Sequence, residues 1–420
     1  MKRVNFLFLF LGILSFYSCK DKVDETITYK INEPVFLAAD QFRGSVKVTN
    51  VPVPITKQGK ICFYQGYLFI SEPEKGIHIV DNRNPSIPTS VGFIELMGNA
   101  DLAIKDNLLY ADSYIDLVWF DISNPSKPVL QGRKENVFPS ALPATNNQYG
   151  YDYAVCSDKT KGVIVGWVVK ERTDNYPYSS EWGGGIKLDG LYSGLNNAGT
   201  KSLGVNGSMS RFAIYKNFLY TVLNNQLGIF NIEADAPVQM GENFYVGWNV
   251  ETIFSYKDCM FMGTPTGMLI YSVADPLKPV FQSSLQHFYG CDPVVVENDK
   301  AYITVRSGNN CGQNINELFV VDVSDVKKPK QLVSYSMTSP KGLGIDNGIL
   351  FLCDDGLKVY DATDPMIMMS KKLAHYQGMD GYDVIPFNNI LMMIASDGIY
   401  QYDYSNLNNI RRLSKLPIRQ

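Results

Sequence analysis

Short hydrophobic segments alternate with polar turns along most of this chain of 420 residues. The segments are rich in Val, Ile, Tyr and Phe, and Gly, Asn, Asp and Pro separate them, which is typical of β-strands joined by turns. One stretch predicts four successive strands, at residues 293–297, 301–305, 318–323 and 331–336. No segment beyond the amino terminus keeps a helical period, so the pattern predicts an all-β protein.

A motif of the form Leu-x-Val-x-Asp, followed by Asn/Asp-Pro-x-x-Pro, recurs along the chain. Clear copies place their Asp at Asp81 and Asp121, and further copies lie around Ser272 and Asp322. Most copies are roughly 40–45 residues apart and contain four short strands, which is the signature of β-propeller blades. Because Pro cannot donate to a sheet ladder and Asn or Asp initiates turns, the Asx-Pro pair marks the hairpin into the outer strand.

The number of blades depends on one irregular copy. The Asp-like position recurs at Asp81, Asp121, Trp167, Asn231, Ser272, Asp322, Asp361 and Asp403. The copy at Trp167 is degenerate, although residues 153–156 before it match the second strand of other repeats. Counting this copy predicts eight four-stranded antiparallel blades, which is our main expectation. Leaving it out predicts seven, which is the alternative.

The repeats resemble those of the LVIVD-repeat proteins, β-propellers found on bacterial cell surfaces. The resemblance covers about residues 60–410, and Trp167, Asn231 and Ser272 depart from the Asp of the motif. It implies a propeller but no particular activity, because the family has no shared catalytic motif and a fold does not carry a function.

The amino terminus has the features of an export signal. A basic start at residues 1–3 precedes an apolar run at 4–17 that is short for a membrane span, which predicts a signal peptide over residues 1–18. The run ends at Cys19 in a sequence that resembles a relaxed lipoprotein box of the Bacteroidetes lineage. This resemblance implies a lipidated Cys19 and a bacterial outer-membrane lipoprotein, facing the cell surface or the periplasm. The alternative is a secreted protein without a lipid.

The remaining chain divides into a tether at residues 19–50, with an accessory strand at 45–48, and a single propeller domain over 51–420. An insertion at about 171–210 breaks the repeat period. Long insertions in repeat proteins map to loops, often on the binding face. Tyr178 and Trp182 lie in it among Gly, Ser and Asn, a composition typical of recognition loops. The alternative is an irregular loop between outer strands that binds nothing.

Candidate binding residues lie where blades join. In a propeller, the loops between blades lie on one face, at the mouth of the central channel. Gly-x-Asx turns recur there, at 247–249, 290–292 and 378–380. One interpretation is a polar, aromatic-lined ligand site, with Asp292, Asp380, Asn249, Trp248 and His375 as candidates beside Trp182 and Tyr178. In the other, Gly permits the turn and the Asx side chain caps it.

Composition narrows the chemistry. A net charge of -4, from 38 basic and 42 acidic residues, gives no electrostatic footprint for nucleic acid. No zinc, redox or calcium-loop spacing occurs, so we expect no metal or cofactor, with Ca²⁺ at an Asp ring as a weak alternative. Cys156 and Cys353 match in position and are expected in the core. Cys291 and Cys311 are the one pair for which we consider a disulfide.

Together these features predict a lipid-anchored cell-envelope propeller that binds an envelope protein or a glycan without catalysis. The alternative is a glycan- or peptide-active hydrolase or lyase at the channel mouth, using Asp292, Asp380 or His375. Such an enzyme needs two acid–base groups within reach of one substrate. No hydrolase, metalloprotease or phosphate-loop motif occurs in the sequence.

Overall fold

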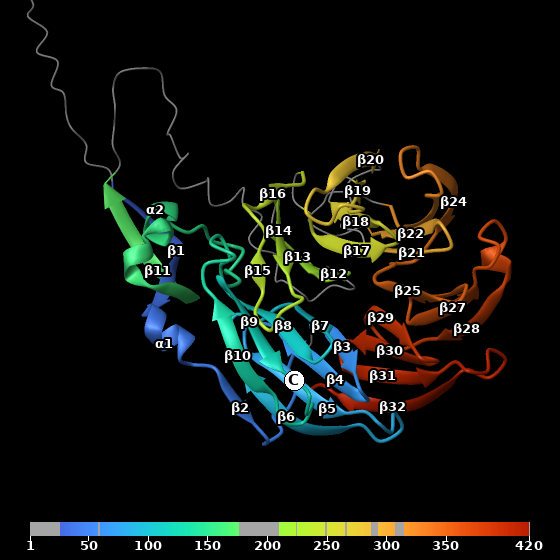
Figure 1. The fold of residues 1–420 in the computed structure, drawn as a ribbon, viewed down its shortest axis with the longest axis horizontal. Coiled ribbons are helices and arrows are strands. Elements are labelled where there is room, and N and C mark those ends of the chain that lie inside the picture. The colour runs from blue at the N-terminus through green and yellow to red at the C-terminus, as the bar shows by residue number, and fades with distance from the viewer. Residues whose placement is uncertain are drawn as a thin grey trace, which may run out of the picture.

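The chain folds into a ring of β-sheets (Figure 1). The computed structural model describes residues 26–57, 59–175, 210–223, 225–247, 250–264, 267–286, 293–306 and 315–419. Within these residues, seven antiparallel blades follow one another around the ring in chain order, each with its first strand innermost. The all-β propeller is therefore confirmed, with seven blades, our alternative, rather than the expected eight.

The first four blades take their strands in order from the centre to the rim. Blade 1 has β3 (Ile61–Tyr64), β4 (Tyr67–Glu72), β5 (Gly76–Asp81) and β6 (Thr89–Glu95), with β2 (Lys47–Thr49) added outside β6, and blade 2 has β7 (Leu102–Lys105), β8 (Leu108–Ser113), β9 (Asp116–Asp121) and β10 (Val129–Lys134). Blade 3 has β12 (Phe212–Tyr215), β13 (Phe218–Leu223), β14 (Gln226–Asn231) and an outer strand in two pieces, β15 (Val238–Gln239) and β16 (Phe244–Tyr245). Blade 4 has β17 (Thr252–Tyr256), β18 (Cys259–Thr264), β19 (Gly267–Ser272) and β20 (Val280–Gln286).

The last three blades repeat the same order. Blade 5 has β21 (Val294–Glu297), β22 (Lys300–Val305), β23 (Glu317–Asp322) and β24 (Lys330–Ser336). Blade 6 has β25 (Leu343–Asp346), β26 (Ile349–Cys353), β27 (Leu357–Asp361) and β28 (Lys372–Tyr376), with a short turn of helix η2 (Met368–Ser370). Blade 7 has β29 (Gly381–Phe387), β30 (Ile390–Ala395), β31 (Gly398–Asp403) and β32 (Arg411–Pro417). The four strands predicted for blade 5 are confirmed to within a residue or two.

The copy at Trp167 does not form a blade. It lies in β11 (Val163–Asn175), which pairs along its length with β1 (Thr26–Leu37) in a separate two-stranded sheet. Residues 153–156, expected as a strand, form helix α2 (Tyr153–Ser157) because the Asp152 side chain caps its first turn, accepting from Ala154 N at 3.0 Å. The backbone groups of β11 are hydrogen-bonded to β1, a strand from the amino terminus, so β11 does not pair with further strands to form a blade.

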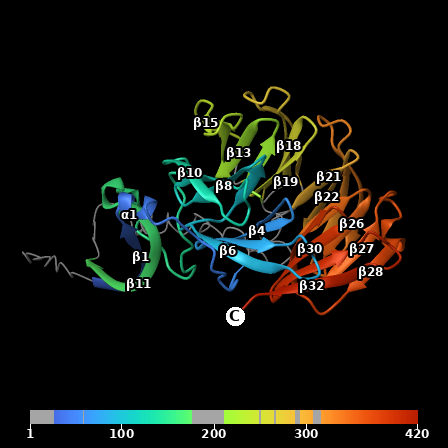
Figure 2. The same cartoon turned by 60° about the horizontal axis from the view of Figure 1, so that its bottom comes forward.

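The β1–β11 ribbon, together with helices α1 (Ala39–Arg43) and α2, is here called the arm. It stands outside the ring beside β10 (Figure 2). The segment expected as a tether thus contains β1 and α1 from Thr26 onward. The accessory strand expected at 45–48 is β2, whose residue Val48 pairs with Ile94 of β6. Helix α2, a turn of helix η1 (Lys159–Lys161) and β11 all belong to the connection from blade 2 to blade 3.

The recurring Asp caps the turn that leads into the outer strand. Asp121 Oδ1 accepts a hydrogen bond from Ser123 N at 2.7 Å, two residues on. The equivalent contact occurs in the other six blades at Asp81, Asn231, Ser272, Asp322, Asp361 and Asp403. Asn231 and Ser272 keep an acceptor oxygen, so they preserve the turn although they depart from the motif.

We expect Asp121→Ala to lower the free energy of unfolding by about 1 kcal/mol, because Ser123 N then loses its partner. Asp121→Asn should stay within about 0.5 kcal/mol of the wild type, since its amide oxygen can accept the same bond. Urea unfolding of the two variants checks this. Equal losses for Ala and Asn would show that the charge, and not the acceptor, matters.

The ring closes between blade 7 and blade 1 without a shared strand. The buried amides of Asn82 and Gln401 exchange two hydrogen bonds, at 2.9 and 2.7 Å, across this seam. Arg419 N donates to the Ile55 carbonyl at 2.8 Å, and apolar side chains including Ile70 and Met392 pack between the two blades. Hydrogen bonds and apolar packing between the two blades therefore close the ring. Among the described residues, no helix is long and apolar enough to cross a membrane.

Candidate functional site

Two faces of the ring differ in the turns they carry. The upper face holds the connections between blades and the turns between second and third strands, and the lower face holds the other two turns of each blade. On the upper face, Lys60, Asp101 and Arg211 each immediately precede the innermost strand of blades 1, 2 and 3. Lys60 Nζ lies 3.7 Å from Asp101 Oδ1, and Arg211 N donates to Asp101 Oδ2. Charges of both signs thus meet at the channel mouth.

Asp112, at the end of β8, is the centre of this cluster. Its Oδ1 accepts from Ala100 N at 2.7 Å and Asp101 N at 2.9 Å, and its Oδ2 accepts from Arg211 Nη2 at 2.5 Å. Burial raises the pKa of Asp112, and the Arg211 guanidinium opposes this rise. Both oxygens are occupied, so the carboxylate orders the loop before β7 rather than offering an acid or base to a ligand.

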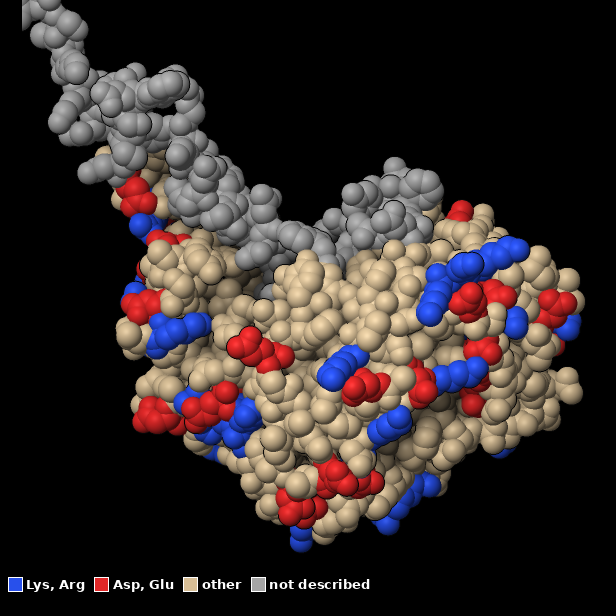
Figure 3. All heavy atoms as spheres, turned by 45° about the horizontal axis from the view of Figure 1, so that its top comes forward, with Lys and Arg blue, Asp and Glu red and all other residues tan. Residues whose placement is uncertain are grey.

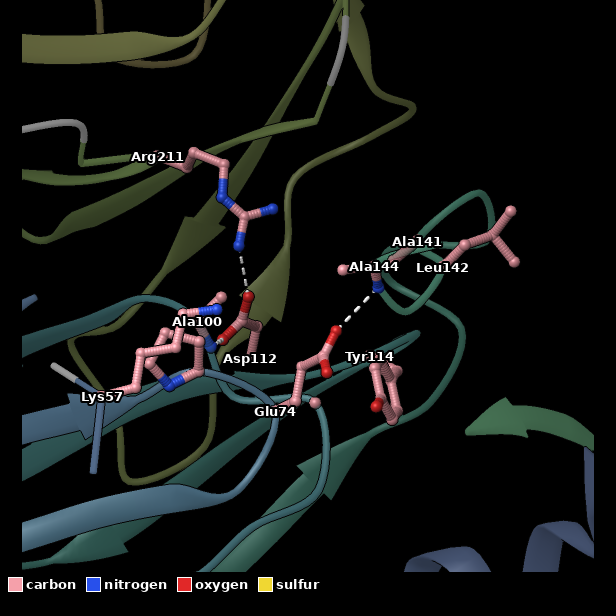
Figure 4. A pocket seen from close by; sticks show the side chains of 11 residues that line it. Lys57, Glu74, Ala100, Asp112, Tyr114, Ala141, Leu142, Ala144 and Arg211 are labelled. Carbon is pink, nitrogen blue, oxygen red and sulfur yellow. Dashed lines mark hydrogen bonds and ion pairs between the residues drawn. The ribbon is translucent and has the colours of Figure 1, made fainter. Parts of the chain in front are cut away.

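A narrow hollow opens above this cluster (Figure 4). It is lined by the side chains of Glu74, Asp112, Tyr114, Leu142 and Arg211, among others. Glu74 Oε1 accepts from Ala144 N at 2.7 Å, so the segment after β10 is tied over the edge of blade 1. The hollow is therefore built jointly by three blades and the connection between blades 2 and 3.

A glycine shapes the floor of the hollow. Gly98 has φ of +75°, and an added Cβ would lie 2.2 Å from Cγ of Tyr114. Only glycine permits both this conformation and the close packing of the Tyr114 ring. The hollow, counted with its open side, spans about 450 Å³, but it has room for only one or two water-sized groups. It can accept a small polar group of a larger ligand.

A second buried charge lies beside it at the end of β4. Glu72 Oε2 lies 2.5 Å from His78 Nε2, and Glu72 Oε1 accepts from Lys75 Nζ at 2.7 Å and Thr56 Oγ1 at 2.5 Å. Burial acts to raise the pKa of Glu72, but the hydrogen bonds from His78, Lys75 and Thr56 outweigh it and lower the pKa to about 2. His78 is itself fully buried, packed on the Phe93 ring.

The lowered pKa of Glu72 predicts that the folded protein loses stability in acid. A depressed pKa stabilises the fold above the unfolded value of 4.5 and loses that stability as the pH falls through about 2. The free energy of unfolding should therefore decrease by about 3 kcal/mol over this window on account of Glu72. Urea unfolding of the wild type and Glu72→Gln between pH 6 and pH 2 measures the difference. Identical pH slopes for the two proteins would contradict this assignment.

The candidates from the sequence fall into two groups. Asp380 lies on the upper face, exposed, where its carboxylate accepts from Lys341 Nζ. His375 lies on β28, with Nε2 2.8 Å from the Asp355 carbonyl and 3.5 Å from its carboxylate. The two side chains therefore have different charged or polar partners, Lys341 for Asp380 and Asp355 for His375. The other candidates lie outside the described residues: Asp292, Asn249, Trp248, Trp182, Tyr178 and Cys19.

The cysteines follow a similar division. Cys156 and Cys353 are buried free thiols, as expected, although Cys156 lies in a helix and Cys353 in a strand. The considered pair of Cys291 and Cys311 lies outside the described residues. No group of metal-ligating side chains occurs in the part of the chain that the structure describes.

Sequence reasoning missed the charges that dock the arm. Asp116, at the start of β9, is fully buried and lies 3.0 Å from both Arg43 Nε of α1 and Arg133 Nη1 of β10. Its Oδ1 also accepts from Asn136 N at 2.8 Å, and the Arg133 guanidinium lies 5.3 Å from the centre of the Phe42 ring. The available signal was a charged residue opening an otherwise apolar strand. Its partner on α1 is too distant in sequence to be inferred.

The repeat itself can be compared with known families. Residues 58–94 and 98–135 match the family model described as the LVIVD repeat. The first match covers the four strands of blade 1 from β3 to β6, and the second covers blade 2 from β7 to β10. The chain carries LVIVD repeats. One LVIVD repeat thus corresponds to one blade of this propeller.

Solved structures resemble the LVIVD propeller in fold. A Bacteroides uniformis protein named as a candidate 6-phosphogluconolactonase is 10% identical, with TM-score 0.50, covering 82% of this chain and 94% of that one. The designed protein Ika8 is 10% identical, with TM-score 0.49 and coverage of 88% and 90%. Hsv2 of Kluyveromyces lactis is 9% identical, with TM-score 0.46 and coverage of 86% and 99%. No curated protein matches the sequence. At 10% identity the likeness to the Bacteroides uniformis protein concerns the fold alone.

Proposed function

We propose that this LVIVD propeller is a lipid-anchored protein of the bacterial envelope that binds a protein partner on its upper face, without catalysis. The observation that carries the proposal is the hollow above Asp112, to which three blades and the connection after β10 contribute. Parts of the chain far apart in sequence converge there on one exposed spot. Propellers commonly present binding surfaces at the channel mouth, and connecting loops carry function more often than the scaffold.

The chemistry of the hollow favours a protein over a glycan. Sugars are held by exposed aromatic faces, whereas the Tyr114 ring is buried and its hydroxyl donates to the Val165 carbonyl at 3.2 Å. Lys57 and Glu74 at the rim are exposed and of opposite charge. Charged groups of both signs are also interspersed over the side of the molecule turned forward in Figure 3. Mixed charge and a small hollow suit the backbone and side chains of a polypeptide.

The arm limits how far the ring could lie from a lipid attached to Cys19. Six residues separate Cys19 from the start of β1 at Thr26, so the seven steps between the two Cα atoms span at most about 25 Å. A lipid on Cys19 would therefore keep the arm close to the membrane. Because Asp116 of blade 2 pairs with Arg43 of α1, blade 2 would be the part of the ring that lies beside the arm and nearest the lipid. The hydrolase or lyase alternative would use Asp292, Asp380 or His375. Asp380 is paired with Lys341 and His375 contacts Asp355, while Asp292 lies outside the described residues, and we do not propose this alternative.

Co-purification tests the proposal. Tagged full-length protein is expressed in its own envelope, solubilised in mild detergent, and compared with Lys57→Glu and Glu74→Lys. A matched control is Lys127→Glu, an exposed charge on the lower face of blade 2. We expect one envelope protein to be recovered with the wild type and the control, and at least tenfold less with the two rim variants. Equal recovery with all four proteins would place the partner elsewhere, and release of the bound material by a glycosidase would identify a glycan.

A further inference from the structure

The lower face carries a second hollow, at the seam where blade 7 meets blade 1. It has a volume of about 150 Å³ and is lined mainly by Phe63, Phe387, Ile390 and Met392, with Arg83 at its rim. The Phe63 and Phe387 rings lie 4.6 Å apart. An apolar cavity of roughly this volume is enough to hold benzene.

Comparison of the blades shows why the hollow is there. The last residue of the innermost strand is polar in blades 1 to 6: Tyr64, Lys105, Tyr215, Tyr256, Glu297 and Asp346. Five of these six side chains make a hydrogen bond to the next blade, and the sixth, Lys105, pairs with its own neighbour Asp106. In blade 7 the same position is Phe387, which is about two fifths exposed.

The hydrogen bond from the last residue of an innermost strand to the next blade is here called the latch. The latch between blades 5 and 6 shows what is missing at the seam. The Glu297 carboxylate accepts from Asn347 N at 2.9 Å and Gly348 N at 2.7 Å, in the first turn of blade 6. The corresponding turn of blade 1 contains Gly66, which lines the hollow. At the seam, an apolar ring therefore replaces the polar latch, and the space beside this turn is open.

The rim adds a cation to the apolar wall. Arg83 pairs with Asp81 at 2.5 Å, and its guanidinium lies 5.6 Å from the centre of the Tyr67 ring. Gly66 has φ of +79°, and a Cβ there would lie 2.6 Å from Cγ of Arg83, so glycine is needed for the Arg83 stem to lie at the edge. Aromatic rings pack favourably on phenylalanine and beneath a guanidinium.

We propose that this seam hollow is a binding site for one aromatic ring of about the size of benzene. The apolar residue at the latch position in one blade out of seven, the phenylalanine pair and the matching volume carry the proposal. The site is independent of the upper face, since it uses the opposite turns of blades 1 and 7. Its occupant enters from the lower side with its ring against Phe63 and Phe387, and any polar substituent points outward toward Arg83.

Ligand-observed NMR with phenol on the purified full chain tests this. We expect saturable binding with a Kd below about 1 mM, at least tenfold tighter than for cyclohexanol. Phe387→Glu restores a latch like that of Glu297, and Ile390→Phe fills the hollow from another strand; each should weaken phenol binding at least tenfold. Phe244→Glu is the matched control, because Phe244 of blade 3 is exposed to a similar degree, and it should bind as the wild type does.

Circular dichroism and the unfolding midpoint establish that each variant folds, and if Phe387→Glu does not fold, Ile390→Phe decides the matter alone. Binding that does not saturate below 10 mM, or that persists in the folded variants, overturns the proposal. Equal affinities for phenol and cyclohexanol would also overturn it, since the site would then have no preference for an aromatic ring. The result does not depend on the upper-face partner, which the rim variants test separately.

Discussion

Replacing Asp116 by Ala is expected to lower the free energy of unfolding by about 3–5 kcal/mol. The Asp116 carboxylate is fully buried and accepts from Arg43, Arg133 and the backbone of Asn136. Its removal leaves the buried Arg133 guanidinium without its counter-charge, and burial already lowers the pKa of Arg133. Uncompensated buried charge is among the largest single-residue costs. Urea unfolding at pH 7 measures the loss.

The same change should release the arm. Arg43 belongs to α1, so without Asp116 the arm keeps its contact with blade 2 through the partly exposed Arg43–Glu135 pair, the packing of Phe42 against Tyr114 and the Tyr114 hydrogen bond to β11. We expect faster amide hydrogen exchange in residues 38–45 of Asp116→Ala than in the wild type. Glu135→Gln is the control, because Glu135 contacts Arg43 at 2.9 Å but is about half exposed, and it should change the stability by less than about 1 kcal/mol. A loss for Asp116→Ala no greater than that of the control would contradict this account of docking.

Replacing Asp112 by Ala should cost a similar amount, about 3–5 kcal/mol, for a related reason. The change removes the acceptor for Ala100 N and Asp101 N and leaves the Arg211 guanidinium unpaired in a buried place. A double-mutant cycle uses Asp112→Asn and Arg211→Gln as the single variants. Adding Arg211→Gln to Asp112→Asn should recover part of the stability that Asp112→Asn loses, because removing both charges leaves no uncompensated ion. Differential scanning calorimetry of the two single variants and the double variant gives the coupling energy.

A matched control for this cycle is Asp106→Ala in the same blade. Asp106 pairs with Lys105 at 2.7 Å but is four fifths exposed, so its removal should change the stability by less than about 1 kcal/mol. If Asp112→Ala behaved as Asp106→Ala does, the upper-face cluster would contribute little to the fold. If the double variant lost as much as the sum of the single variants, the two charges would act independently.

The sequence predicted the propeller because the evidence for it is local and repeated. Each turn at Asp81 or Asp121 is fixed by a contact two residues away, and each blade is built from consecutive strands. Residues that are close in the chain and repeated along it are visible without a structure. This is why the strand bounds of blade 5 could be placed almost to the residue.

The eighth blade was wrong because its strand is paired over a long distance. Trp167 lies opposite Pro34 of β1, and no local pattern in residues 163–175 shows that a strand from the amino terminus takes their ladder. The site was hidden for the same reason. Asp101 and Asp112 of blade 2 meet Arg211 only once blades 2 and 3 are set side by side, and Asp116 meets Arg43 across some 70 residues. Of the residues that the sequence did select, Asp380 lies on the expected face.

The most direct test of the central claim is crosslinking in the native envelope. A photoreactive amino acid is placed at Leu142, which lines the upper hollow, or at Asn408, which is exposed on the lower face of blade 7. Intact cells are irradiated, and the adducts of the tagged protein are separated by size and identified by mass spectrometry. The account predicts one defined protein adduct from position 142 and none from position 408. An adduct from position 408 alone, or no adduct from position 142, would contradict it.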